Sequence, residues 1–162
     1  GDAVFIRAGT VHALSDVVVF EVQENSDVTF RLYDWDHVDP QTNQKRPLQV
    51  DQAMSCINFK QGIIGPVVPQ VDEAKPLPWE KLIRCDHFGV WRISGQFPFK
   101  VGATETCRVL VCLEGKGDLE HVGVDYLFGA GDVLLLPAAV GAWACKPNGT
   151  VTLLEIALPG FS

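Results

Sequence analysis

Short runs in which apolar and polar residues alternate follow one another along most of this chain, a pattern typical of half-buried β-strands. In the first 35 residues, three such runs are rich in valine and phenylalanine and are separated by turn residues: 3–6, 17–23 and 28–35. In the third run, Arg31 lies between Phe30 and Leu32. We therefore expect Arg31 on the face of the strand opposite to these two residues.

The second half of the chain carries a longer series of such runs, with glycines in the turns between them. The segment EGKGDLE, at 114–120, predicts a hairpin because glycine accepts the positive φ of a tight turn. Regularly spaced strands with glycine-bearing turns are typical of a β-sandwich or barrel. This half therefore predicts a complete small barrel, whereas the three runs before it are too few to close one. The runs are 87–95, 107–120, 126–137, 140–146 and 149–158.

Two segments between these halves break the strand pattern. Residues 47–59, PLQVDQAMSCINF, place apolar residues at a helical period, and Pro47 suits the first turn, so one short helix is expected. Residues 62–79 hold four prolines and two glycines, which indicates an extended strap or linker. We therefore expect three parts, namely residues 1–61, a strap at 62–80, and residues 81–162.

The composition is that of a globular protein and narrows the classes of function. The chain has 162 residues, is 47% hydrophobic and carries a net charge of −7, so it lacks the basic character of a nucleic-acid-binding protein. Its five cysteines include no CxxC pair, which favours free thiols in a cytoplasmic protein over a disulfide scaffold or a zinc finger. No apolar run reaches the length of a membrane span. We expect neither a nucleic acid nor a membrane as a partner.

Two stretches of the chain repeat the same pattern of residues. They are GDAVFIRAGTVHAL, from Gly1, and GDVLLLPAAVGAWA, from Gly131, and an ungapped alignment pairs His12 with Ala142. A Gly-Asp turn, an apolar strand, a small-residue turn and a histidine resemble the second motif of the cupin superfamily, whose histidine can bind a divalent metal. The resemblance implies an all-β cupin (jelly-roll) chain with a partial first cupin, a complete second cupin barrel and one short helix. Because the second copy lacks the histidine, we expect that barrel to be metal-free.

A longer stretch resembles the type I mannose-6-phosphate isomerase family. It is AGTVHALSDVVVFEVQENSDVTFRLYDWDH, at 8–37. The matching features are His12 in GTVHAL, Glu21 nine residues later, and Arg31 in SDVTFR. The segment RPLQVDQA, from Arg46, also resembles the family's R-x-L-x-x-x-x-A segment.

The resemblance implies a zinc-dependent isomerase that interconverts mannose 6-phosphate and fructose 6-phosphate, with His12 as a zinc ligand. The candidate catalytic residues are Arg31 and Glu21. A cation stabilises the enediolate that forms when a proton moves between C1 and C2, and a carboxylate can move that proton. The candidate substrate-binding residues are His37 and Arg46, for the phosphate of the sugar. Relatives usually carry Arg or Lys at the position of His37.

The family's other zinc ligands, a Gln, a His and a Glu, lie upstream of the GTVHAL motif, so the resemblance implies that they precede Gly1. We therefore expect the C-terminal portion of a longer isomerase, whose incomplete first cupin has strand edges that favour homo-oligomers or strand swapping. The alternative is a non-catalytic sugar-binding or oligomerisation module that has lost its metal site. A cupin oxygenase is disfavoured because it needs two histidines and a carboxylate as metal ligands.

Overall fold

The computed structural model describes residues 1–75 and 77–158, which form two compact units. One unit contains Gly1–Ala3 and the chain from Pro66 onward, and the other is Val4–Gly65. Among the described residues, no helix is long and apolar enough to cross a membrane.

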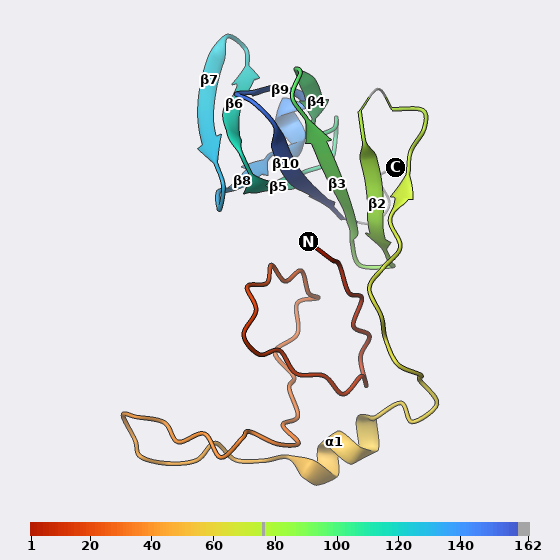
Figure 1. Cartoon of the computed structure of the whole chain (residues 1–162), viewed down its shortest axis with the longest axis vertical. Coiled ribbons are helices and arrows are strands. Elements are labelled where there is room, and N and C mark those ends of the chain that lie inside the picture. The colour runs from red at the N-terminus through yellow and green to blue at the C-terminus, as the bar shows by residue number, and fades with distance from the viewer. Residues whose placement is uncertain (76, 159–162) are drawn as a thin grey trace. The chain divides into compact units, whose positions relative to one another are not determined.

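The unit from Pro66 onward consists of two antiparallel sheets (Figure 1). Their strand orders are β1-β2-β3-β10-β5-β8 and β4-β9-β6-β7, so neighbours in a sheet are often distant in sequence. A 3₁₀ turn, η1, spans Ala138–Val140. The strands of the first sheet are β1 Gln70–Val71, β2 Trp79–Arg84, β3 Gly89–Gly95, β5 Arg108–Glu114, β8 Val133–Leu136 and β10 Val151–Ala157. Those of the second sheet are β4 Phe99–Val101, β6 Lys116–His121, β7 Val124–Gly129 and β9 Trp143–Pro147.

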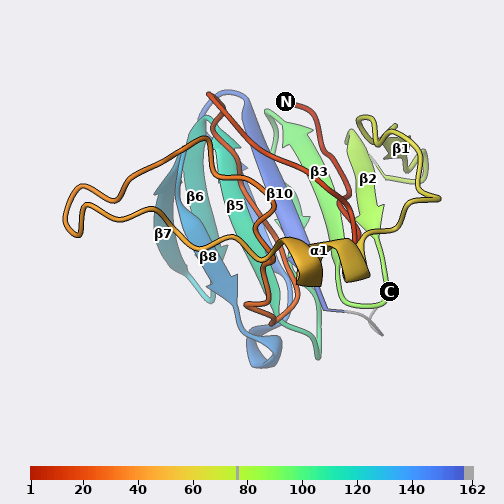
Figure 2. The same ribbon diagram turned by 90° about the horizontal axis from the view of Figure 1, so that it is seen from below.

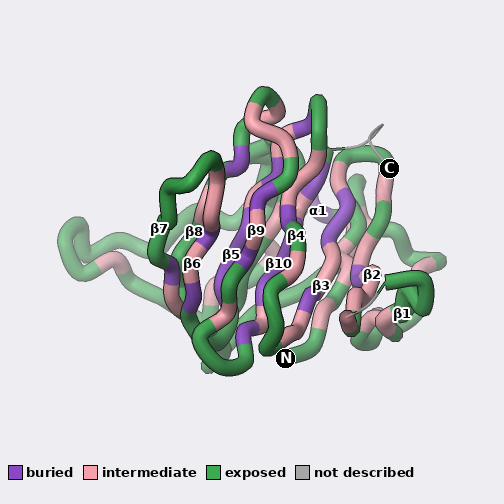
Figure 3. The backbone as a smooth tube through the Cα atoms, turned by 90° about the horizontal axis from the view of Figure 1, so that it is seen from above, coloured by how far each residue is buried: buried purple, intermediate pink, exposed green. Residues whose placement is uncertain are grey.

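The core of this unit lies between the two sheets. One apolar cluster takes Ile93, Leu110 and Leu153 from the six-stranded sheet, and Leu119 and Cys145 from the four-stranded sheet, all at most 1% exposed. Buried and partly buried residues follow the central strands, whereas the turns and the edge strands β1 and β7 are largely exposed (Figure 3). Two sheets joined by one such core form the sandwich-like barrel of a cupin, so the predicted second barrel is confirmed.

One predicted turn in this unit is wrong. The segment 114–120 is not a hairpin, because β5 and β6, on either side of Gly115, belong to different sheets. Gly115 has φ of +83°, and a Cβ added to it would lie 2.2 Å from the carbonyl oxygen of Thr150. The glycine therefore lets the chain cross from one sheet to the other against the backbone of a distant turn.

The unit Val4–Gly65 has one helix, α1 Val50–Cys56 (Figure 2). The helix falls within the predicted segment, but Pro47 precedes it by three residues instead of lying in its first turn. The cap residue Gln49 accepts through its carbonyl the N–H of Ala53, which is the buried residue of the helix.

The strands predicted at 3–6, 17–23 and 28–35 are not formed. Residues 4–65, all of which the structure describes, contain no strand and one isolated bridge, between Val38 and Lys45. A strand needs partners for its backbone N–H and C=O groups, and these segments have no neighbouring ladder. Many of their apolar side chains are also exposed, with Val18 at 103% and Val17 at 60%.

Candidate functional site

His12, the predicted zinc ligand, follows a turn that is packed against the end of α1. Gly9 has φ of +81°, and a Cβ on it would lie 2.6 Å from the carbonyl oxygen of Cys56, so the turn requires glycine. The Gly9 carbonyl accepts the N–H of Asn58 at 3.0 Å, and the Thr10 hydroxyl accepts the amide N–H of Gln61 at 2.8 Å. The residues after α1 therefore fix the turn that carries His12.

The imidazole of His12 is oriented by its own turn. Its Nδ1 lies 3.0 Å from the carbonyl oxygen of Thr10. A carbonyl can only accept, so Nδ1 donates in this hydrogen bond, and in the neutral imidazole Nε2 then carries the lone pair. A histidine that donates one ring N–H to a carbonyl and offers the other nitrogen has the arrangement common among metal ligands. His12 is thus suited to bind a metal, as one ligand of a set.

Glu21, the predicted acid–base residue, is exposed and makes no hydrogen bond or ion pair with another side chain in the part of the chain that the structure describes. The structure records no contact between Glu21 and His12.

Arg31 and Arg46 meet at one carboxylate, that of Asp34. Arg46 donates its Nε–H to Asp34 Oδ2 at 2.8 Å, and its Nη2 donates to Oδ1. Arg31 Nε lies 3.5 Å from the same Oδ1. The Asp34 side chain is 12% exposed, against 27% for Arg31 and 49% for Arg46, so the acid lies beneath two cations that face solvent.

A second ion pair, between Lys45 and Asp36, forms in the same loop. Lys45 donates to Asp36 at 2.5 Å, with both side chains exposed. The backbone N–H of His37 donates to the carbonyl of Asp34 at 2.8 Å. The pKa of the Asp34 carboxyl is lowered mainly by the hydrogen bond from Arg46, with smaller contributions from the charges of Arg31 and His37. The structure therefore brings together three of the five predicted residues, namely Arg31, His37 and Arg46.

A folded loop brings these residues together. The Asp39 carboxylate accepts the N–H groups of Gln41 at 2.7 Å and Thr42 at 3.0 Å, and the Asp39 N–H donates to the carbonyl of Gln44 at 2.9 Å. This turn reverses the chain, so Arg46 returns to Asp34 although twelve residues separate them. Sequence reasoning did not select Asp34 as a site residue, although its spacing of three from Arg31 was visible.

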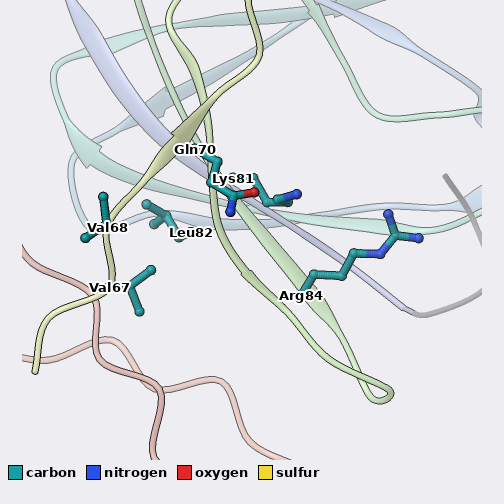
Figure 4. A pocket seen from close by; sticks show the side chains of 6 residues that line it. All are labelled: Val67, Val68, Gln70, Lys81, Leu82 and Arg84. Carbon is teal, nitrogen blue, oxygen red and sulfur yellow. The ribbon is translucent and has the colours of Figure 1, made fainter. Parts of the chain in front are cut away.

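A separate cavity of about 270 Å³ lies in the unit from Pro66 onward (Figure 4). In Figure 4, the side chains of Lys81 and Arg84 extend away from Val67 and Val68, so the two cations do not converge on the apolar side of the cavity. The cavity contains none of the predicted site residues. Its lining residues are Val67, Val68, Gln70, Lys81, Leu82 and Arg84.

No cluster of three or more His, Cys, Asp or Glu side chains suited to a metal occurs among residues 1–75 and 77–158. His12 is the one predicted ligand, and in that part of the chain it belongs to no such cluster.

Comparison with known proteins gives several relatives of one kind. The chain is 34% identical over 151 residues to a Bacillus subtilis protein named "Probable mannose-6-phosphate isomerase GmuF", with 90% of this chain and 46% of that protein covered. It is 31% identical over 147 residues to "Mannose-6-phosphate isomerase" from Streptococcus mutans, with 88% and 45% covered. No family model matches the chain.

A solved structure supports the fold. The chain superposes on the crystal structure of mannose 6-phosphate isomerase from Bacillus subtilis with a TM-score of 0.69 and 23% identity, covering 82% of this chain and 41% of that one. The chain spans about half the length of the curated relatives that it matches.

Proposed function

We propose that this chain, a homologue of mannose-6-phosphate isomerases with the cupin fold, is part of a zinc-dependent isomerase of mannose 6-phosphate and fructose 6-phosphate. The observation that supports the proposal best is the similarity over about 90% of the chain to proteins that bear this name. The meeting of Arg31 and Arg46 at Asp34 adds a cationic site suited to an anionic sugar.

Each site residue has a chemical role in this reaction. His12 offers Nε2 to the metal, since its Nδ1–H is held by the carbonyl of Thr10. When bound, zinc would act as a Lewis acid that polarises the sugar oxygens. Glu21 takes the proton from one carbon and returns it to the neighbouring carbon.

The two arginines act on the negative charges of the substrate. Arg31 stabilises the enediolate that forms between the two proton transfers, because a fixed cation near the developing charge lowers the barrier. Arg46 and His37 hold the phosphate. Arg46 is the stronger of the two for this purpose, since a guanidinium is always charged and can donate two parallel N–H bonds to an anion.

The test is an isomerase assay on the full-length protein that contains this chain. Formation of fructose 6-phosphate from mannose 6-phosphate should be lost after treatment with a chelator and regained with zinc. His12→Ala should abolish turnover and lower the zinc content, whereas His87→Ala, in the exposed turn between β2 and β3, should leave both unchanged.

The alternative function has a distinct outcome in the same experiment. A full-length protein that binds mannose 6-phosphate but forms no product with zinc present is a sugar-binding module and not an isomerase. An active His12→Ala variant with unchanged zinc content would show that the metal site lies elsewhere.

A further inference from the structure

Asp34 is the carboxylate on which the two arginines of the candidate site depend. Both of its oxygens are occupied, Oδ2 by Arg46 Nε and Oδ1 by Arg46 Nη2 and Arg31 Nε. A two-point contact between a guanidinium and a carboxylate fixes the plane and the direction of the guanidinium, which a single contact does not. Asp34 thus sets the orientation of Arg46 and the distance between the two guanidinium groups.

The main chain beside this carboxylate is also held in place. Gln49 Oε1 accepts the backbone N–H of Arg31 at 2.9 Å, and the backbone N–H of Gln49 donates to the carbonyl of Arg31 at 2.9 Å. Both polar groups of the Arg31 backbone are therefore bound to Gln49, the N-cap residue of α1. The backbone of Arg31 is thus held in place, and Asp34 determines the position of the Arg31 guanidinium group.

The cluster keeps capacity for an anion after these contacts. Two arginines and one aspartate leave a net positive charge. Each guanidinium has five N–H donors, and Arg46 uses two of them on Asp34 while Arg31 directs only Nε toward it. Because the two cations are more exposed than Asp34, their unused donors remain accessible to an anion from solvent.

We infer that Asp34 is a positioning residue that holds Arg31 and Arg46 at a fixed separation, so that Arg46 binds the phosphate of a sugar phosphate while Arg31 faces the reacting carbons of the same molecule. This inference rests on the proposed function for the identity of the sugar phosphate, and on the geometry alone for the binding of an anion. Asp34 does not touch the substrate in this arrangement. It acts through the two arginines, and its loss allows them to turn toward solvent or apart by mutual repulsion.

The experiment compares Asp34→Asn with a matched control in the full-length protein. Asp36→Asn is the control, since it is the same substitution two residues away and breaks only the exposed pair with Lys45. For Asp34→Asn we expect KM for mannose 6-phosphate and Ki for inorganic phosphate to rise together by about tenfold, and kcat to fall by about tenfold. For Asp36→Asn all three should stay within about twofold.

A double-mutant cycle separates positioning from a general loss of structure. Because Asp34 acts through Arg46 in binding, Asp34→Asn should change KM by less than about twofold when Arg46 is already Gln. Asp34→Glu, which keeps the charge, should recover part of the phosphate affinity even if Asp34→Asn folds poorly. A fall in kcat with unchanged KM and Ki, which partial unfolding would produce, overturns the inference, as does full additivity in the cycle.

The inference and the proposed function can fail separately. Calorimetric titration with inorganic phosphate needs neither turnover nor zinc. Phosphate binding that depends on Asp34 in a protein without isomerase activity would support the inference and refute the proposed reaction. If the protein is an active isomerase and Asp34→Asn leaves its phosphate affinity unchanged, the inference is refuted but the proposed function is not.

Discussion

Glu155 on β10 accepts the Nε–H of Arg108 on β5 at 3.1 Å, and the two side chains are 6% and 8% exposed. The same carboxylate accepts the backbone N–H of Gly102 at 3.3 Å, just after β4 in the other sheet. Arg108 also donates from Nη1 to the Thr106 hydroxyl at 2.7 Å. One buried ion pair therefore joins both sheets of the barrel.

Removal of Arg108 should destabilise this barrel strongly. Arg108→Met leaves the Glu155 carboxylate buried without its partner, and the free energy of unfolding at neutral pH should fall by about 3 kcal/mol. Arg108→Met with Glu155→Leu should recover much of this loss, because no unpaired charge remains buried. Guanidinium unfolding followed by tryptophan fluorescence measures both. A double variant as unstable as the single one would contradict this account.

Glu155 should make the stability of the barrel depend on pH. Burial raises the pKa of the Glu155 carboxyl above its ordinary value of 4.5, more than the Gly102 N–H and Arg108 lower it. The folded state then binds a proton more readily than the unfolded state, so this contribution to stability is complete below pH 4.5 and is lost as the pH rises through the folded pKa. Glu155→Gln cannot titrate. The stability of the wild-type chain relative to this variant should therefore decrease above pH 4.5, and a constant difference would rule the effect out.

Gly115 should tolerate no side chain. Gly115→Ala would place its Cβ 2.2 Å from the Thr150 carbonyl oxygen at a φ of +83°. The free energy of unfolding should therefore fall by about 3 kcal/mol. Gly123→Ala is the matched control, since Gly123 also has positive φ, +76°, but no atom within 4 Å of an added Cβ. This control should cost only about 1 kcal/mol. Equal losses of stability in the two variants would mean that strain in φ, and not the close approach to Thr150, causes the destabilisation.

Most strands of the barrel overlap the runs predicted from the sequence, but β1, β2 and β4 do not, and the sheets that the strands join could not be predicted. Alternation of apolar residues is local, and it located β3 and β10 well. The assignment of β5 and β6 to different sheets depends on the approach of Gly115 to Thr150, which lies thirty-five residues away. In residues 4–65, alternation alone was misleading, because a strand also requires a partner.

In the candidate site too, the sequence predicted the residues of the motif but not the contact that brings them together. The motif spacing selected Arg31 and Arg46, and the structure places both at Asp34. The function of Asp34 as a shared partner depends on the turn at Asp39, which returns Arg46 to it. Whether His12 and Glu21 act together remains a prediction from the motif.

The five cysteines should differ widely in reactivity, because a thiol reacts as its thiolate and needs access to the reagent. Burial raises the pKa of the Cys145 thiol to about 12, and the side chain is fully buried. Burial also raises the pKa of the Cys112 thiol, whose Sγ lies 3.4 Å from the Glu114 carbonyl oxygen.

At pH 8 an aromatic disulfide reagent should rapidly modify Cys56 of the native chain, because this residue is exposed. Cys112 and Cys145 should react only as fast as the barrel opens, and all five thiols should react at once in guanidinium. Cys56→Ser should remove the fast phase. Fast modification of Cys145 in that variant would show that β9 detaches from the core in the native state, since no thiolate is accessible there otherwise.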